Sequence, residues 1–291
     1  MINGFINLNK PDTVSSNKAL GILKHALRTL GIKEKMGHFG TLDPLAEGVL
    51  PVALGRATRL FDYSLDKVKS YTAEFLLGAY SPSFDRGTDI TYYPYVLPDE
   101  KTIIDALCSL TGEVMQIPPS YSAKSVGGIR AYKLARNGEE VVLSPKKVNI
   151  YTIELLSTDR ARNVLKVRIE CGGGTYVRAI ARDLGEKLGT KCIMLSLVRT
   201  KSGFFKIENS VALTTIENSP EILLQSIIPL KEYLSVFPKI DINSDEKRTL
   251  LNGLTLRHEL NGYTAVFCDE HPVGIGEAVN NGEMKIKTWL L

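Results

Sequence analysis

Asp43 is the residue of this 291-residue sequence whose setting points most directly to chemistry. It lies in a loop punctuated by Gly37, Gly40 and Gly48, and glycine permits tight turns and the close approach of a ligand. Pro44 follows directly and disfavours helical backbone at Asp43, so we expect the carboxylate on an extended segment. Such a carboxylate can act as a nucleophile or as a base. Taken alone, the pattern also fits an aspartate that stabilises a turn or caps a helix.

The other residue types that carry chemistry do not form recognisable sites. The four histidines lack ligand spacing with each other or with the cysteines, and no two cysteines form a CxxC pair. We therefore expect no metal site, and we expect the cysteines to be free thiols in a reducing cytoplasm. The sequence has no GxxxxGK[ST] loop and no complete dinucleotide fingerprint, so no cofactor is expected.

A serine acyltransferase is one alternative that the sequence raises. Residues 15–18 read as SxxK, and residues 201–203 resemble a KTG element. No SDN-like element lies between them, and SxxK is common by chance. We therefore interpret Ser15 and Ser16 as helix caps.

Helix and strand patterns surround the Asp43 loop. Apolar residues at helical spacing over 19–30 follow the two serines and precede Gly31, which suits a helix end. Strands are predicted at 49–54, 71–77 and 165–171, and a further helix at 177–188. These elements mix without a regular βαβ rhythm. The pattern favours an α+β fold in which helices flank a mixed, largely antiparallel sheet.

The C-terminal part of the chain differs from the rest in charge and pattern. Residues 1–230 carry a net charge of +6 and residues 231–291 a net charge of −2, within a total of +4. Short strand-like runs separated by glycine turns predict a small β-barrel in the tail. We expect two domains, 1–235 and 236–291. No apolar run approaches 18 residues, so no membrane span is expected, and the N-terminus lacks a secretion signal.

One basic segment stands out within the larger domain. Residues 119–149 hold six basic and two acidic side chains, with Tyr121 and Tyr132 interleaved. Basic side chains with aromatic neighbours suit a polyanion that has exposed bases. An ordinary solvated surface has a similar composition, so the segment alone does not identify a partner.

Five blocks of sequence, in the same order, resemble the TruB-type tRNA pseudouridine-55 synthase family. The loop at 37–50, GHFGTLDPLAEGVL, resembles the family signature GHxGTLDPxAxGxL. The other four blocks are KPDTVSS at 10–16, which resembles the KPxGxTS start, KSYTA at 69–73, which resembles the KxYxA strand, the RNA-gripping thumb segment at 116–136, and GTYVRAIARDLG at 174–185, which resembles GTYxRxLxxDLG. The resemblance covers residues 1–230 firmly and the tail loosely.

The resemblance implies an enzyme that isomerises one uridine in the T-loop of tRNA, at position 55, to pseudouridine. The N-glycosidic bond breaks, the uracil turns, and C5 bonds to C1′, without redox change, metal or nucleotide cofactor. The target base must leave the loop stack to be reached. The implied partner is the T-arm of tRNA. We expect a cytoplasmic monomer that needs neither a membrane nor a protein partner.

By resemblance, Asp43 is the essential carboxylate and Arg178 is the arginine that pairs with it. Tyr71 matches the tyrosine that stacks on the flipped base, and its hydroxyl could assist proton transfer at C5; the alternative is a core residue of its strand. Further substrate contacts are implied for His38, in the space that the uridine leaves, for Tyr176 and Leu197, in the pocket lining, and for the cations Lys10, Lys124, Arg130, Lys133 and Arg136, on phosphates. Leu197 fits a core position equally well. The tail resembles a short PUA-type RNA-binding domain.

Several positions depart from the family pattern. Thr13 stands where glycine is usual and Ser15 where threonine is usual, and Ser125 follows Lys124 where many members have a basic residue. Glu47 stands where a small residue is usual, and we expect it to point outward, because its charge would repel phosphate at the site. The tail is short and acidic, so its RNA role is the weakest assignment.

Two other functions stay open on the sequence alone. A catalytically silent RNA-binding module or tRNA-folding chaperone would share the basic segment. A glycosylase that removes the base would share the flipped base and the carboxylate. The sequence also does not separate attack of Asp43 at C1′ from proton abstraction at the ribose or attack on the uracil ring.

Overall fold

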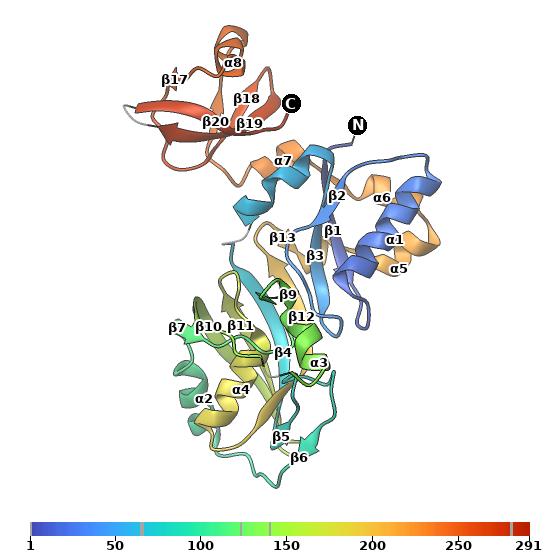
Figure 1. The fold of residues 1–291 in the computed structure, drawn as a ribbon, viewed down its shortest axis with the longest axis vertical. Helices are drawn as coiled ribbons and strands as arrows, with labels where there is room; N and C mark the ends of the chain where they lie inside the picture. The colour runs from blue at the N-terminus through green and yellow to red at the C-terminus, as the bar shows by residue number, and fades with distance from the viewer. Residues whose placement is uncertain (1, 65–66, 123, 140, 280–281) are drawn as a thin grey trace.

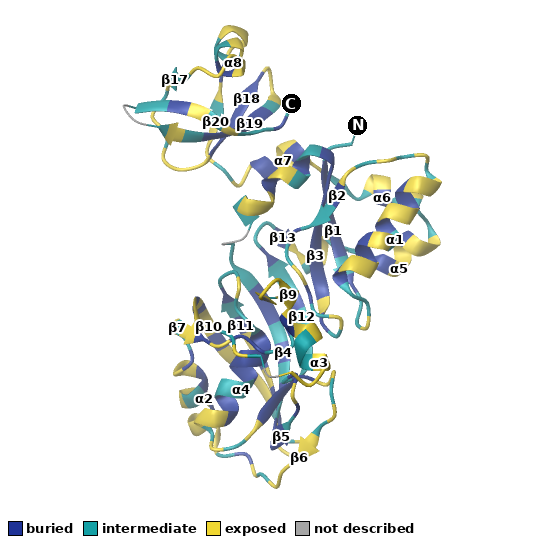
Figure 2. Cartoon of the chain, in the orientation of Figure 1, coloured by how far each residue is buried: buried dark blue, intermediate teal, exposed yellow. Residues whose placement is uncertain are grey.

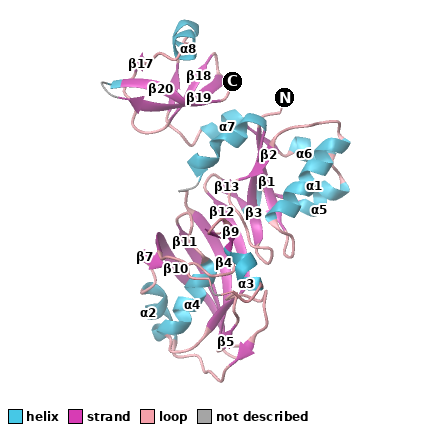
Figure 3. Ribbon diagram, in the orientation of Figure 1, coloured by secondary structure: helices cyan, strands magenta, loops and turns pink. Residues whose placement is uncertain are grey.

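The structure, a computed structural model, describes residues 2–64, 67–122, 124–139, 141–279 and 282–291. A long sheet runs through the larger part of the molecule, and a separate smaller sheet lies at the end that carries the C-terminus (Figures 1 and 3). The strands of the long sheet are, in order, β14 (Val211–Ala212), β1 (Gly4–Lys10), β3 (Glu47–Leu54), β12 (Cys192–Ser202), β4 (Lys69–Leu77), β11 (Val164–Cys171), β10 (Lys146–Asp159) and β7 (Gly112–Gln116), with β2 (Met36–His38) on β3, β13 (Phe205–Lys206) on β12 and β15 (Ile227–Pro229) on β1.

The long sheet is mixed and largely antiparallel, which confirms the predicted fold class. Strands β1 and β14 pair in parallel, as do β12 and β3, whereas the other pairs in this sheet are antiparallel. The register places Tyr71 of β4 opposite Arg199 of β12 and pairs Arg199 with Gly48 of β3. The centre of the sheet therefore joins the end of the Asp43 loop to Tyr71.

Helices cover the sheet in two groups. The first group is α1 (Ser16–Thr29), α5 (Leu213–Asn218) and α6 (Glu221–Gln225), which pack together beside β1 and β2 (Figure 1). The second group is α2 (Glu100–Cys108) and α4 (Val177–Lys187), which pack against β10, β12 and β4. The Ser15 side chain accepts a hydrogen bond from the Lys18 backbone N–H and Gly31 adopts a φ of 75°, so the sequence signals at both ends of α1 are confirmed.

Smaller elements project from the long sheet. Two short strands, β8 (Ser125–Val126) and β9 (Ile129–Arg130), lead into α3 (Ala131–Arg136), between β7 and β10 in the chain. Figure 2 shows most of this segment as exposed. A second hairpin consists of β5 (Ala79–Tyr80) and β6 (Thr91–Tyr92).

Apolar side chains form cores on both faces of the long sheet. The larger core lies between the sheet and its helices, and it includes Leu50, Phe75 and Ile180. A second, aromatic core forms around Phe5, whose ring centroid lies 4.2 Å from that of Tyr233. Side chains of the smaller sheet belong to this aromatic core, so packing joins the two sheets.

The smaller sheet is built from the C-terminal residues. Its strands are, in order, β16 (Lys239–Asp241), β18 (Thr264–Cys268), β19 (His271–Val279), β20 (Glu283–Trp289) and β17 (Leu256–Arg257), accompanied by α8 (Ser244–Leu251) and joined through α7 (Leu230–Leu234). It contacts the short helix η1 (Gly55–Ser64) of the larger part, where the Tyr63 hydroxyl and Thr288 Oγ1 lie 2.7 Å apart. A second short helix, η2 (Ile207–Asn209), lies against β1 and β12. The sheet is curled, in agreement with the predicted small PUA-like β fold. None of the helices among the described residues has the length and apolar character that crossing a membrane requires.

Candidate active site

The Asp43 loop is fixed to α1 and β1 by buried polar groups. Ser16 Oγ donates to the Leu42 carbonyl at 2.9 Å and accepts from the Leu42 N–H at 3.0 Å. Lys10 ends β1, and its Nζ donates to the carbonyls of Pro11, Val14 and Pro44 at 2.8, 2.6 and 3.2 Å. The backbone on both sides of Asp43 is therefore held by side chains outside the loop. This use of Ser16 favours a structural role over nucleophilic catalysis.

Arg199 holds the other side of the loop. Its Nε donates to the Val49 carbonyl at 2.7 Å and its Nη1 to the Thr41 carbonyl at 3.4 Å, and the side chain is almost completely buried. Gly48 adopts a φ of 99°, and a Cβ there would lie 2.3 Å from the Arg199 carbonyl oxygen. Glycine is thus required at 48 both by backbone conformation and by the close approach of β12.

Arg178 reaches Asp43 from the first turn of α4. Its Nη2 lies 2.8 Å from Asp43 Oδ2, and its guanidinium also donates to the carbonyls of Ser83 and Tyr121 at 3.1 and 2.9 Å. The Arg178 side chain is 4% exposed, whereas that of Asp43 is 39% exposed. The Arg178 guanidinium is therefore buried and held by backbone carbonyls, whereas the Asp43 carboxylate keeps one side exposed to solvent. A guanidinium in this position orients a carboxylate.

Asp85 is a second carboxylate on the same guanidinium, and no sequence pattern singles it out. Its Oδ2 lies 3.5 Å from Arg178 Nη1, and its side chain is only 9% exposed. Its Oδ1 accepts from Ser83 Oγ at 2.5 Å and from the Gly87 N–H at 2.8 Å. Asp85 sits in a turn-rich stretch, SPSFDRGTD at 81–89, and such a stretch carries no signal of a partner in α4. The three groups form a row in which the buried Asp85 orients the buried Arg178, and Arg178 orients the partly exposed Asp43.

These groups form the floor of a cleft of about 1130 Å³. The cleft is lined by Asp43, Asp85 and Arg178, by His38 and the start of α1, and by the basic segment through Arg130 and Arg136. Tyr121 and Tyr132 also line it. The structure thus brings together one partly exposed carboxylate, cationic walls and aromatic surfaces. Such a cleft suits a polyanionic ligand that presents one unit to the carboxylate.

The remaining aromatic and apolar candidates lie around this cleft in different ways. Tyr71 is 7% exposed and packs in the larger core, and burial raises the pKa of its hydroxyl. Leu197 is also buried there, opposite Ala73, so its position fits packing, and its pocket role stays a prediction. Tyr176 precedes α4, and burial raises the pKa of its hydroxyl too. His38 lines the cleft, and burial lowers the pKa of its ring.

The expected phosphate contacts divide into two groups. Arg130 and Arg136 line the cleft, Lys133 is exposed on α3, and Lys124 is half-buried just before β8. Lys10 requires a correction, because it is 0% exposed and its ammonium donates to three backbone carbonyls. It holds the Asp43 loop and has no surface on which to meet a phosphate. Glu47 is exposed at the start of β3, as expected.

Comparison with known proteins places the chain in a family. Residues 27–177 match the family described as TruB family pseudouridylate synthase (N terminal domain). A relative named tRNA pseudouridine synthase B from Anaplasma phagocytophilum (strain HZ) is 41% identical over 92% of this chain and 90% of its own length. Another of the same name, from Clostridium tetani (strain Massachusetts / E88), is 35% identical over 98% of this chain and 99% of its own length.

Solved structures share the fold over nearly the whole chain. A structure described as a Cbf5-Nop10-Gar1 complex contains a chain that is 25% identical, with a TM-score of 0.72 over 98% of this chain and 79% of that one. A structure of an H/ACA RNP bound to a substrate RNA contains a chain that is 23% identical, with a TM-score of 0.74 over 99% of this chain and 85% of that one. The second likeness concerns the fold alone. From the matched residues and the two relatives, this chain belongs to the TruB family of pseudouridylate synthases.

Proposed function

We propose that this protein isomerises a uridine of tRNA to pseudouridine, and that the uridine is position 55 in the T-loop. The observation that carries the proposal is the Asp43–Arg178 ion pair at the floor of a cleft with basic walls, in a chain whose relatives are named tRNA pseudouridine synthase B. The reaction is an internal rearrangement with no net redox change, so it requires no metal and no cofactor. It takes place in the cytoplasm, and one copy of the chain is sufficient.

The chemistry would proceed at the open side of Asp43. The target uridine leaves the loop stack and enters the cleft. The carboxylate drives cleavage of the bond between N1 and C1′, the uracil turns, C5 bonds to C1′, and the hydrogen on C5 leaves as a proton. Arg178 holds the carboxylate in a fixed orientation through the 2.8 Å ion pair. Because burial raises the pKa of Tyr71, its hydroxyl stays protonated and can take part in proton transfer at C5.

The test of this function follows hydrogen and mass together. With tRNA labelled with tritium at uracil C5, we expect the protein to release tritium while the mass of the unlabelled RNA stays unchanged. A silent RNA-binding module would release none, and a glycosylase would yield free uracil and an abasic site. Either of these results would reject the proposal.

The basic thumb segment is proposed to hold the RNA backbone. Reversal of two cations, Lys133→Glu with Arg136→Glu, should weaken tRNA binding by about 10-fold or more and reduce the slope of log K against log salt by about one to two. The reason is that each phosphate contact releases counterions when it forms. Kd measured by filter binding at several salt concentrations checks this.

The matched control reverses two exposed lysines that do not line the cleft, Lys166 and Lys187. This control should leave the salt slope unchanged. An equal slope in the thumb variant and wild type would contradict the phosphate contacts.

The C-terminal sheet, residues 236–291, is likewise proposed as an RNA-binding domain that meets the acceptor-stem side of tRNA.

Lys10 is proposed as a positioning residue for the Asp43 loop. Replacement by Met keeps the length of the side chain but removes the three hydrogen bonds to carbonyls, so the loop loses its fixed backbone. We expect Lys10→Met to lower kcat by about 10- to 100-fold, as small misplacements of catalytic groups do. The Kd for tRNA should change little, because the ammonium is buried. Single-turnover rates and Kd, measured together, check this, and a change confined to Kd would contradict it.

The pH dependence gives an independent check on Lys10. Burial lowers the pKa of Lys10 from 10.5 to about 8. Since the unfolded chain binds this proton more tightly, the contribution of Lys10 makes the fold more stable as pH rises from about 8 to 10.5. At the same time the neutral amine has two N–H groups for three carbonyls, so kcat should fall above about pH 8. Both trends should be absent in Lys10→Met, in melting curves and in pH–rate profiles.

A further inference from the structure

A second basic surface lies along α1 and has no part in the mechanism above. Residues 16–36 hold five basic side chains and one acidic side chain, which gives them a net charge of +4. All five basic side chains are exposed, and Figure 2 shows exposed residues along the outer side of α1. We call this surface the α1 basic face; its defining residues are Lys18, Lys24, Arg28, Lys33 and Lys35.

The charges of the α1 basic face are not balanced within the protein. None of its five cations forms an ion pair with a carboxylate in the described part of the chain, although the helices α5 and α6, which pack on α1, carry the exposed Glu217 and Glu221. The one acidic residue of the segment, Glu34, accepts a hydrogen bond from the Ile2 N–H at 2.9 Å. The face therefore keeps its positive charge for a ligand.

The positions of these cations oppose formation of the helix itself. Lys18 stands in the first turn of α1, which has no acidic residue, and a cation there opposes the helix dipole. Lys24 and Arg28 are four residues apart, so their like charges repel along the helix surface. The stability of α1 rests instead on its apolar side, where Leu20 and Leu23 belong to the larger core. Cations that destabilise their own helix indicate that this surface binds an anion.

The α1 basic face begins at the wall of the Asp43 cleft and leads away from it. Ser15, Ser16 and Asn17, at the start of α1, line the cleft. The 14 residues of the helix span about 21 Å, so its last turn lies well beyond the cleft. α1 packs near the β1 and β2 end of the long sheet, whereas the basic segment at 119–149 joins β7 to β10 at the other end (Figure 1). The cleft therefore lies between two basic surfaces.

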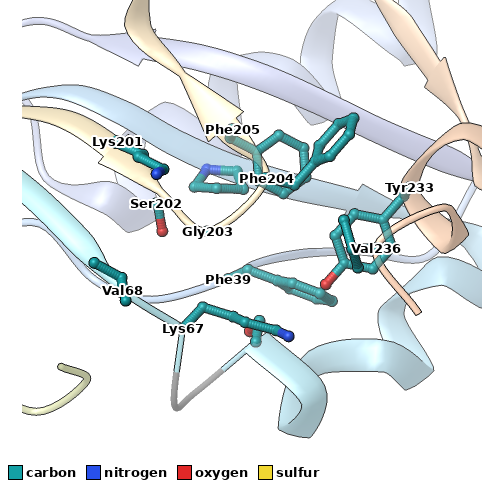
Figure 4. Close-up of a pocket in the computed structure, with 12 residues that line it drawn as sticks. Phe39, Lys67, Val68, Lys201, Ser202, Gly203, Phe204, Phe205, Tyr233 and Val236 are labelled. Atoms are coloured by element: carbon teal, nitrogen blue, oxygen red, sulfur yellow. The ribbon is translucent and has the colours of Figure 1, made fainter. Parts of the chain in front are cut away.

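The opposite face of the long sheet is covered in a different way. It carries the aromatic core, to which Phe39, Phe205 and Tyr233 belong and on which the smaller sheet packs. Figure 4 shows the cavity of about 280 Å³ that these rings line. α1 packs instead in the larger core, together with Leu42 of the Asp43 loop. The α1 basic face and the Asp43 cleft thus lie on the same face of the long sheet.

The chemistry of the α1 basic face fits the backbone of an RNA duplex. A basic amphipathic helix binds a membrane through its apolar side, but the apolar side of α1 is buried in the larger core. Residues 16–36 include no phenylalanine, tyrosine or tryptophan on which an unpaired base could stack, in contrast to the basic segment at 119–149. Duplex RNA presents its phosphates outward and is held through them.

We propose that the α1 basic face binds the phosphate backbone of a helical arm of the RNA substrate other than the arm that carries the target uridine. The proposal rests on the proposed function, because it takes the substrate to be a folded tRNA. The thumb segment is proposed to hold the target arm from the β7 and β10 side of the cleft. A second arm then meets the protein on the α1 side, and full-length tRNA makes contacts that an isolated stem–loop lacks.

The test compares two RNAs against one pair of cations. Full-length tRNA and the isolated stem–loop with the target uridine are bound to the Asp43→Asn protein, which does not consume them, with and without Lys24→Glu/Arg28→Glu. The reversal should weaken binding of full-length tRNA about 10-fold and reduce its slope of log K against log salt by about one to two. The Kd of the stem–loop should change less than about twofold. The reason is that Lys24 lies about 10 Å along the helix from Asn17 at the cleft, and Arg28 farther, beyond a Debye length of about 8 Å.

Two controls separate this contact from general charge and from folding. Lys166→Glu/Lys187→Glu reverses two exposed lysines that do not line the cleft, and it should leave the binding of both RNAs unchanged. Lys24→Gln/Arg28→Gln removes the repulsion within α1, so it should melt no lower than its parent while it still weakens binding of full-length tRNA. The proposal is overturned if both RNAs lose affinity equally, which would place the target arm on α1, or if neither does. Tritium release from the stem–loop by wild type is read separately, so failure of the proposed function would be seen on its own.

Discussion

Asp43→Asn should abolish turnover while tRNA binding survives. The change removes the ionised oxygen that Arg178 orients at 2.8 Å but keeps the shape of the side chain. Loss of a group that acts directly on the reacting atoms costs on the order of 10⁴-fold or more in kcat. The carboxylate contributes no attraction for phosphates, so Kd should stay within about threefold of wild type or improve. Tritium release from C5-labelled tRNA and filter binding measure the two quantities on the same preparation.

The matched control for this prediction is Asp89→Asn. Asp89 is an exposed aspartate of the same turn-rich stretch as Asp85, and it does not line the cleft. It should keep full activity. Release of tritium by Asp43→Asn at more than about 1% of the wild-type rate would remove Asp43 from the reaction. Loss of both binding and turnover would instead indicate that the loop had collapsed, which melting curves would reveal.

Much of the fold near Asp43 could be predicted from local pattern. The helix predicted at 177–188 corresponds to α4 (Val177–Lys187). Gly189 follows its end and adopts a φ of 69°, which suits the glycine that the sequence places there. The strand predicted at 71–77 corresponds to most of β4. These signals are short-range, since glycine at a helix end and alternation along a strand are properties of neighbouring residues.

The site itself was less predictable, because its contacts join distant segments. Only family resemblance connected Asp43 with Arg178, and nothing connected Arg178 with Asp85. Family resemblance assigned Lys10 to phosphate, although Lys10 is the last residue of a buried strand and its side chain has no exposed surface. For Arg199 a signal was present. Arg199 stands two positions after Leu197 on β12, so both side chains lie on the same, buried face of the strand. A buried cation there must find polar partners.

Arg178→Met is expected to remove turnover and to destabilise the fold, and the two effects have different causes. Without the guanidinium, Asp43 loses its orienting partner, and kcat should fall by about 100-fold or more, as for the loss of one preorganised donor. Asp85 is then left as a buried carboxylate without its cation, which costs about 3–5 kcal/mol when a buried pair is broken. Denaturant melts and single-turnover tritium release measure these effects separately.

The double variant Arg178→Met/Asp85→Asn shows whether the row Asp85–Arg178–Asp43 acts in the way that its geometry indicates. An amide at 85 removes the uncompensated charge and can still accept from the Gly87 N–H, so much of the lost stability should return. Turnover should not return, because Asp43 still lacks Arg178. Asp85→Asn alone should lower kcat by about 10-fold with unchanged Kd, since Arg178 keeps its bonds to the Ser83 and Tyr121 carbonyls but loses one anionic anchor. If stability and turnover recovered together in the double variant, Arg178 would serve only to hold the fold, and orientation of Asp43 would have to come from Lys10 and Arg199 through the loop backbone.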